Sequence, residues 1–249
     1  MTADVETRAK LLSDVLANPD DDGPRLVFAD WLTQNGDVRG ELIVTQIQLE
    51  HATGAARMKL VNRSSDLLYR QGTWLSEIKE VVRGVETKRG FVYAINAKAS
   101  VFAKSCGAWF EREPIEELRV IKPSARDLAT LRRTKHLAKL RALVFLDPVG
   151  LRSGAEVEAL GELLASAKLR SLDLRISVDA VEELRALLAK LVLPSLEVLK
   201  LRVRSPSPVA DALAKAKLSA LKQLAVPKPA VEPLSIAFPK ATVSAIASA

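Results

Sequence analysis

The stretch Leu196-Glu197-Val198-Leu199-Lys200-Leu201 has apolar residues at its first, fourth and sixth positions. The same pattern recurs in four other segments, which begin at Ile115, Leu140, Leu169 and Leu221. The five first positions are 25, 29, 27 and 25 residues apart, a spacing typical of repeat architectures. A weaker copy begins at Val92. We therefore predict one strand in each segment.

Between these segments, apolar residues recur three and four positions apart, which indicates helices. The clearest set is Val157, Leu160, Leu163 and Leu164. A chain that alternates strand and helix places neighbouring strands parallel, because each helix carries the chain back to the start of the next strand. One strand and one helix cannot bury their apolar faces alone, whereas stacked neighbours form a continuous core.

Residues at the third, fifth and seventh positions of the pattern should project from the other face of the sheet, which we expect to be concave. An apolar strip there, formed by Ala142, Val144 and Leu146, would lie beside basic side chains, as in many interaction surfaces. The alternative is that a helix, a loop or a second copy covers the strip. The predicted partner-binding residues are Glu117, Arg119, Ala142, Val144, Leu146, Ser171, Asp173, Arg175, Val198, Lys200 and Arg202.

The first 52 residues read as three short helices. The turn-forming run from Asn18 to Pro24 ends the first helix, and Gln34-Asn35-Gly36 ends the second. Asp37 is a suitable N-cap for the third, because its carboxylate can accept backbone N–H groups that have no partner within the helix. Trp31 is expected in the core of this segment, and Asp30 and Arg39 are expected to be architectural, as an ion pair or as partners of helix ends.

Three motifs of this segment carry a resemblance to a known family: Leu16-Ala17-Asn18-Pro19-Asp20-Asp21, Arg25-Leu26-Val27-Phe28-Ala29-Asp30-Trp31-Leu32 and Gly36-Asp37-Val38-Arg39-Gly40-Glu41. Together they resemble the bacterial repeat-companion domain, over about a fifth of the chain. That family precedes repeat arrays, often leucine-rich ones, and its biochemical role is largely undefined. Arg89-Gly90-Phe91-Val92 looks like the strand that commonly follows it, and residues 90–227 resemble leucine-rich repeats.

The expected fold class is therefore α/β: a leucine-rich-repeat solenoid, with parallel strands on its concave side and helices on its convex side, behind an all-helical N-terminal module. The expected segments are an acidic helical repeat-companion module (1–52), a helical connector or N-terminal cap (53–88), the leucine-rich repeats (89–227) and a C-terminal cap or tail (228–249).

Charge is divided unevenly along the chain. Residues 1–52 contain 4 basic and 10 acidic side chains, whereas the remainder contains 33 basic and 20 acidic ones. Such a division can serve an anionic partner, contact between the two parts, or self-association of two copies. Nucleic acid or another polyanion could bind the basic run Arg132, Arg133, Lys135 and Lys139, but only 4% of residues are aromatic, which provides poorly for base stacking.

Few residues are candidates for a catalytic or metal-binding site. Cys106 is the only cysteine, so neither an internal disulfide nor a multi-cysteine metal site can form; a lone thiol fits the cytoplasm, and we expect it to be a buried small apolar residue. His51 and His136 belong to no recognisable catalytic arrangement, and no phosphate-binding glycine loop is present. Asp20-Asp21-Asp22 is expected to be a solvated turn, because its spacing does not match a calcium loop. No apolar run approaches the roughly 20 residues of a membrane span.

These observations predict a non-catalytic module or scaffold without cofactor or metal. Its partner would be a protein or peptide on the concave face, with Val144 and Leu146 as apolar anchors and with Arg175, Lys200 and Arg202 setting charge complementarity. Binding of nucleic acid or another polyanion, and self-association, are the alternatives.

Overall fold

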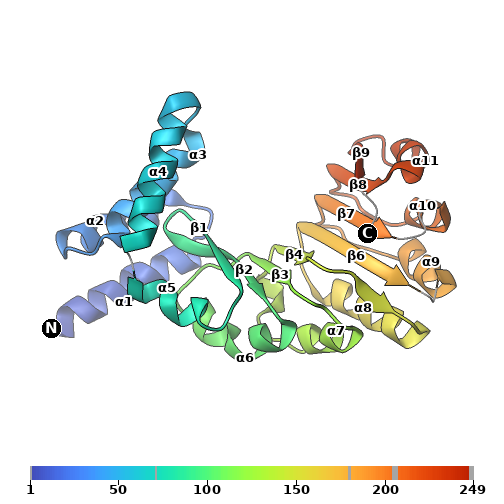
Figure 1. Cartoon of the computed structure of the whole chain (residues 1–249), viewed down its shortest axis with the longest axis horizontal. Helices are drawn as coiled ribbons and strands as arrows, with labels where there is room; N and C mark the ends of the chain where they lie inside the picture. The colour runs from blue at the N-terminus through green and yellow to red at the C-terminus, as the bar shows by residue number, and fades with distance from the viewer. Residues whose placement is uncertain (1, 71, 179–180, 204–206, 247–249) are drawn as a thin grey trace. The chain divides into compact units, whose positions relative to one another are not determined.

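The structure is a computed structural model that describes residues 2–70, 72–178, 181–203 and 207–246 (Figure 1). The chain divides into two compact units. Unit 1 comprises Met1–Ile95 and Gly107–Ile115, and unit 2 comprises Asn96–Cys106 and Glu116–Ala249. No helix in the described part of the chain is both long enough and apolar enough to span a bilayer.

Helices form most of unit 1, and local capping sets their ends. The Asp21 carboxylate accepts the Gly23 N–H at 2.9 Å at the start of the second helix. The third helix begins at Arg39 with Val38 as its N-cap, so the prediction of Asp37 as N-cap is wrong by one residue, although the Asp37 carboxylate accepts the Arg39 N–H at 2.9 Å. The helices are α1 (Thr2–Ala17), α2 (Asp22–Gln34), α3 (Arg39–His51), α4 (Gly54–Arg70) and α5 (Gly72–Lys79).

A hairpin completes unit 1. Strands β1 (Gly84–Lys88) and β2 (Phe91–Ala97) are joined by Arg89 and Gly90, whose φ angles are 52° and 78°. Two successive positive φ values are typical of a two-residue hairpin turn, which makes the two strands antiparallel. The last two residues of β2 belong to unit 2.

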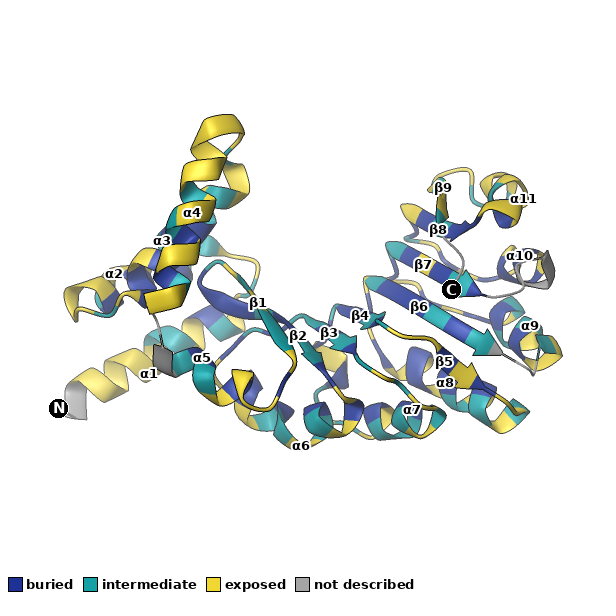
Figure 2. Ribbon diagram, in the orientation of Figure 1, coloured by how far each residue is buried: buried dark blue, intermediate teal, exposed yellow. Residues whose placement is uncertain are grey.

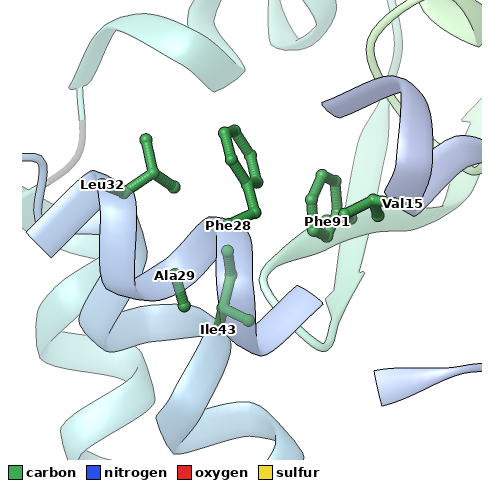
Figure 3. Close-up of a cluster of buried hydrophobic side chains, with 6 residues drawn as sticks. All are labelled: Val15, Phe28, Ala29, Leu32, Ile43 and Phe91. Carbon is green, nitrogen blue, oxygen red and sulfur yellow. The ribbon is translucent and has the colours of Figure 1, made fainter. Parts of the chain in front are cut away.

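One apolar cluster of unit 1 joins three helices to the hairpin (Figure 3). The ring centroids of Phe28 and Phe91 lie 6.2 Å apart in a stacked arrangement. Trp31, which was expected in the core, is only partly buried; it packs against the cluster and stacks on Phe28. The cluster consists of Val15, Phe28, Ala29, Leu32, Ile43 and Phe91.

Unit 2 alternates strands and helices, as the spacing predicted. Its strands are β3 (Glu117–Val120), β4 (Ala142–Phe145), β5 (Val149–Leu151), β6 (Ser171–Val178), β7 (Val198–Val203), β8 (Gln223–Pro227) and β9 (Thr242–Ile246). Its helices are α6 (Ala99–Phe110), which extends into unit 1, α7 (Ala125–Arg132), α8 (Gly154–Ser166), α9 (Val181–Ala189), α10 (Ser207–Leu213) and α11 (Val231–Ala237), with 3-10 turns at Leu137–Lys139 and Lys228–Ala230.

The described strands form one nine-stranded sheet in the order β1-β2-β3-β4-β6-β7-β8-β9, and β5 pairs with β6. The pairs from β3 to β9 are parallel. Figure 1 shows α7, α8 and α9 following one another along one side of these strands. Leucines of the repeated pattern, such as Leu118, Leu143 and Leu172, are fully buried or nearly so, as are Leu128, Leu160 and Leu184 of the helices.

The expected leucine-rich-repeat solenoid behind an all-helical module is wrong. The chain is a mixed α/β protein around a nine-stranded, mostly parallel sheet, which begins with the β1–β2 hairpin of unit 1. Its strands are unequal: β3 and β4 have four residues and β6 has eight, and β5 is an additional strand. The leucine spacing indicates only that each strand buries one face beneath a helix. A parallel sheet has this property too, and it does not need identical repeats.

Candidate partner-binding face

The register of unit 2 brings the predicted partner-binding residues together on one sheet face. Glu117 is level with Ala142, Ala142 with Ser171, and Ser171 with Val198. The next row runs from Arg119 through Val144 and Asp173 to Lys200, and Arg175 is level with Arg202. Adjacent strands lie about 4.8 Å apart, so neighbours within a row are in contact range. We call the eleven predicted residues, Leu146 included, the open face.

Burial alternates along these strands, which separates the open face from the core. In β7, for example, Leu199, Leu201 and Val203 are buried, whereas Val198 and Arg202 are partly exposed and Lys200 is exposed. Figure 2 shows the alternation along β7; along β6 it is interrupted at Asp173, which is buried like Leu172 and Leu174. Helices lie on the leucine side of the sheet, and the polar residues of the open face other than Asp173 are partly or fully exposed.

The apolar strip of the open face is only partly accessible. Val144 and Leu146 are partly exposed, whereas Ala142 is 6% exposed. Ala142 is therefore a poor contact residue, because almost none of its surface is accessible. Val144 lies level with Asp173, so the remaining apolar surface borders charged side chains directly.

Two ion pairs neutralise part of the open face. Arg202 donates to Asp173, and Arg119 donates to Glu117. Asp173 is only 9% exposed, so we expect it to hold Arg202 in place rather than to contact a partner. Lys200 forms no ion pair with any residue that the structure describes. The Nε atom of Arg175 is buried and has no hydrogen-bond acceptor among the described residues.

The register also adds residues that the leucine pattern did not include in the predicted site. Gln223 and Ala225 lie level with Val198 and Lys200, and Thr242 and Ser244 follow on β9. The signal for β9 was available in Thr242, Val243 and Ile246, because β-branched residues favour a strand. The outward side chains at this edge of the sheet are small and polar, and Thr242 and Ser244 are exposed.

The other residues singled out from the sequence form no second site on this face. Cys106 is buried in α6. His51 ends α3 in unit 1, whereas His136 precedes the 3-10 turn after α7 in unit 2. Among the described residues, no group of three or more histidine, cysteine, aspartate or glutamate side chains could hold a metal ion. The suggested pairing of Arg39 with Asp30 is wrong, because Arg39 pairs with Glu113.

No protein-family model matches this chain, and no curated protein matches it. The class is therefore defined by geometry: a mixed α/β protein with a mostly parallel sheet, one face of which carries accessible charged side chains.

Proposed function

We propose that unit 2 binds an acidic, partly apolar segment of a protein partner on its open face and catalyses no reaction. The observation that carries this proposal is the Arg175 guanidinium. Its Nε–H is buried without an acceptor in the described chain, while the nearest acid along its strand, Asp173, is taken by Arg202. The Arg175 side chain as a whole is partly exposed and forms no ion pair with the described residues, so its guanidinium charge can pair with a carboxylate of the partner.

Charge complementarity supports an acidic occupant. The open face carries four basic residues and two acidic ones. The pairs Arg202–Asp173 and Arg119–Glu117 account for both acids. Arg175 and Lys200 then remain as the two positive charges available to a partner. Guanidinium groups suit this task, because their planar donors match both oxygens of a carboxylate.

The apolar part of the face favours a peptide over a nucleic acid. Val144 and Leu146 are partly exposed beside the charged residues, so a peptide could place an apolar side chain there and an acidic one at Arg175. None of the eleven open-face residues is aromatic, which leaves no platform for base stacking. We include a cytoplasmic setting in the proposal, because a lone thiol such as Cys106 stays reduced there.

The test measures binding of a short fluorescent peptide that alternates Glu and Leu, by anisotropy. A second peptide with Gln in place of Glu, and a single-stranded oligonucleotide of equal charge, are compared with it. We expect the double variant Arg175→Gln/Lys200→Gln to bind the Glu peptide at least about tenfold more weakly than the wild type, because hydrogen bonds to charged groups are lost.

The matched control is Arg185→Gln/Lys190→Gln, which removes the same two charges from the region of α9 on the helical side of the sheet. It should leave the affinity within about twofold. Equal binding of the Gln peptide, equal losses in the two double variants, or stronger binding of the oligonucleotide would each overturn the proposal. The last result would indicate a polyanion site instead.

A further inference from the structure

A pocket of about 580 Å³ lies within unit 1. One wall comes from α1, through Val5 and Leu12, and another from Trp74 of α5. Its buried end is formed by Arg39 and Glu113, which are 5% and 3% exposed. The volume falls within the range of small-molecule sites, about 300–1,000 Å³.

The Arg39 guanidinium is fixed on several sides. Its Nη2 donates to both carboxylate oxygens of Glu113 at 2.9 and 3.0 Å, and its Nε donates to the Gly90 carbonyl at 3.0 Å. Its planar group lies 3.8 Å from the ring centroid of Trp74 and 4.3 Å from that of Phe91. Such a cation is pre-organised, because its side-chain entropy has been lost before any ligand arrives.

One nitrogen of the Arg39 guanidinium, Nη1, has N–H donors that are not used by the described chain. The Nη1 of Arg39 makes no hydrogen bond to any described residue. Burial lowers the pKa of Arg39 from its ordinary value, and the positive charge of Arg8 acts in the same direction, whereas Glu113 and Asp37 raise it. An arginine nevertheless stays protonated. A further anion at the pocket end would therefore be favoured.

A second cation stands at the pocket wall. Arg8 of α1 lines the pocket and has no ion pair with the residues that the structure describes. The other lining arginine, Arg112, is already paired with Glu77 at 2.7 Å, an exposed pair on the rim. Arg8 and the free side of Arg39 thus provide donors for one anionic group, while Val5, Leu12 and Trp74 provide apolar contact.

We propose that this pocket binds a small monocarboxylate with an apolar or aromatic body. The carboxylate accepts from Arg39 Nη1 and pairs with Arg8, and the body packs against Leu12 and Trp74. Carboxylates suit a guanidinium because two oxygens match its planar donors. The apolar walls require a ligand with more than a bare anion, since they would otherwise stay in contact with water.

The experiment is calorimetric titration of the full chain with 3-phenylpropionate. Three further probes test the parts of this ligand separately. 3-phenylpropionamide lacks the charge, acetate lacks the apolar body, and inorganic phosphate is an anion of different shape. We expect the carboxylate to bind at least about tenfold more tightly than each of them. Arg8→Gln should weaken binding about tenfold, because it removes one charged partner.

The matched control is Lys10→Gln, which removes an exposed positive charge from the same helix at a position outside the pocket lining. It should leave the dissociation constant within about twofold. Ala9→Trp, at an exposed position on the pocket wall, should abolish binding without lowering the thermal midpoint. Equal affinity for the amide, equal effects of Arg8→Gln and Lys10→Gln, or no heat with any probe up to about 10 mM would overturn the proposal.

Discussion

Replacing Glu113 by glutamine tests how unit 1 is held together. The Glu113 carboxylate accepts two hydrogen bonds from Arg39 and a third from the Val92 N–H at 2.7 Å. It therefore joins α3 to the start of β2. Burial raises the pKa of Glu113, while Arg39 and the Val92 N–H act in the opposite direction. We expect those partners to keep the carboxylate ionised at neutral pH.

The magnitude follows from burial. The side chains of Arg39 and Glu113 are 6% and 3% exposed, so the glutamine variant would leave an arginine charge in the interior without its counterion. Breaking a buried pair in this way costs about 3–5 kcal/mol. The amide also turns an NH₂ group toward donors that need acceptors. For a chain of this size, the expected fall in the unfolding midpoint is about 6–20 °C.

The assay is thermal and urea unfolding at neutral pH, followed by tryptophan fluorescence and circular dichroism. Arg112→Gln is the control, because Arg112 and Glu77 form a pair that is 64% and 72% exposed. It should cost less than about 1 kcal/mol. A loss below about 1 kcal/mol for Glu113→Gln would refute the reasoning, because it would mean that the folded protein keeps this carboxyl group uncharged.

Three further changes test the packing and charges of unit 1. Gly40→Ala should destabilise by about 1–3 kcal/mol in urea unfolding, because its Cβ would lie 2.4 Å from the Ala29 carbonyl oxygen of α2. Gly90→Ala should destabilise by at least about 2 kcal/mol by the same measurement. Its φ of 78° is unfavourable for alanine, and the new Cβ would lie 2.2 Å from a side-chain atom of Ile43 in α3. Glu50→Gln should cost about 0.5–1 kcal/mol at neutral pH, because the pKa of Glu50 is lowered by Arg89 and Lys88 despite partial burial, and the difference from wild type should disappear as pH falls below about 4.5.

Separate results would contradict these three predictions. Gly150→Ala is the packing control, because a Cβ there would meet no atom within 4 Å; an equal cost at positions 40 and 150 would contradict the close approach of α2 and α3. A stable Gly90→Ala variant would contradict the described turn. For Glu50, a lowered folded pKa adds stability above the unfolded value and loses it through acidification. A difference that persists in acid would therefore exclude its ionised form as the cause.

The sequence could predict the elements of unit 2 because local pattern determines them. An apolar residue at every second position, as at Leu199, Leu201 and Val203, marks the buried side of a strand, and the residues between them must face the other way. The rows of the open face follow from that alternation plus the parallel register. The leucine pattern did not predict the overall fold class, because the pattern also fits a parallel sheet with unequal strands and an edge hairpin.

The long-range side-chain interactions of unit 1 could not be predicted from local sequence patterns. Arg39 and Glu113 are 74 residues apart, and neither lies in a motif that specifies the other. Their pairing depends on where the β1–β2 hairpin packs, which the short-range pattern does not encode. The same holds on the open face for the Arg202–Asp173 pair, which spans 29 residues. Charged residues are predictable as members of a face, whereas their partners require the register.

The pocket also shows why the charge of a segment is a poor guide to its binding chemistry. Residues 1–52 are strongly acidic, with only four basic side chains. Two of these four, Arg8 and Arg39, line the pocket, and a third, Arg25, is 3% exposed with its guanidinium 5.8 Å from the Phe91 ring centroid. The acidic residues of this segment, such as Asp4, Glu6 and Asp14, lie mostly on its exposed surface, where water and salt screen them. A segment with net negative charge can therefore present a locally positive site, because burial determines which of its charges a ligand meets.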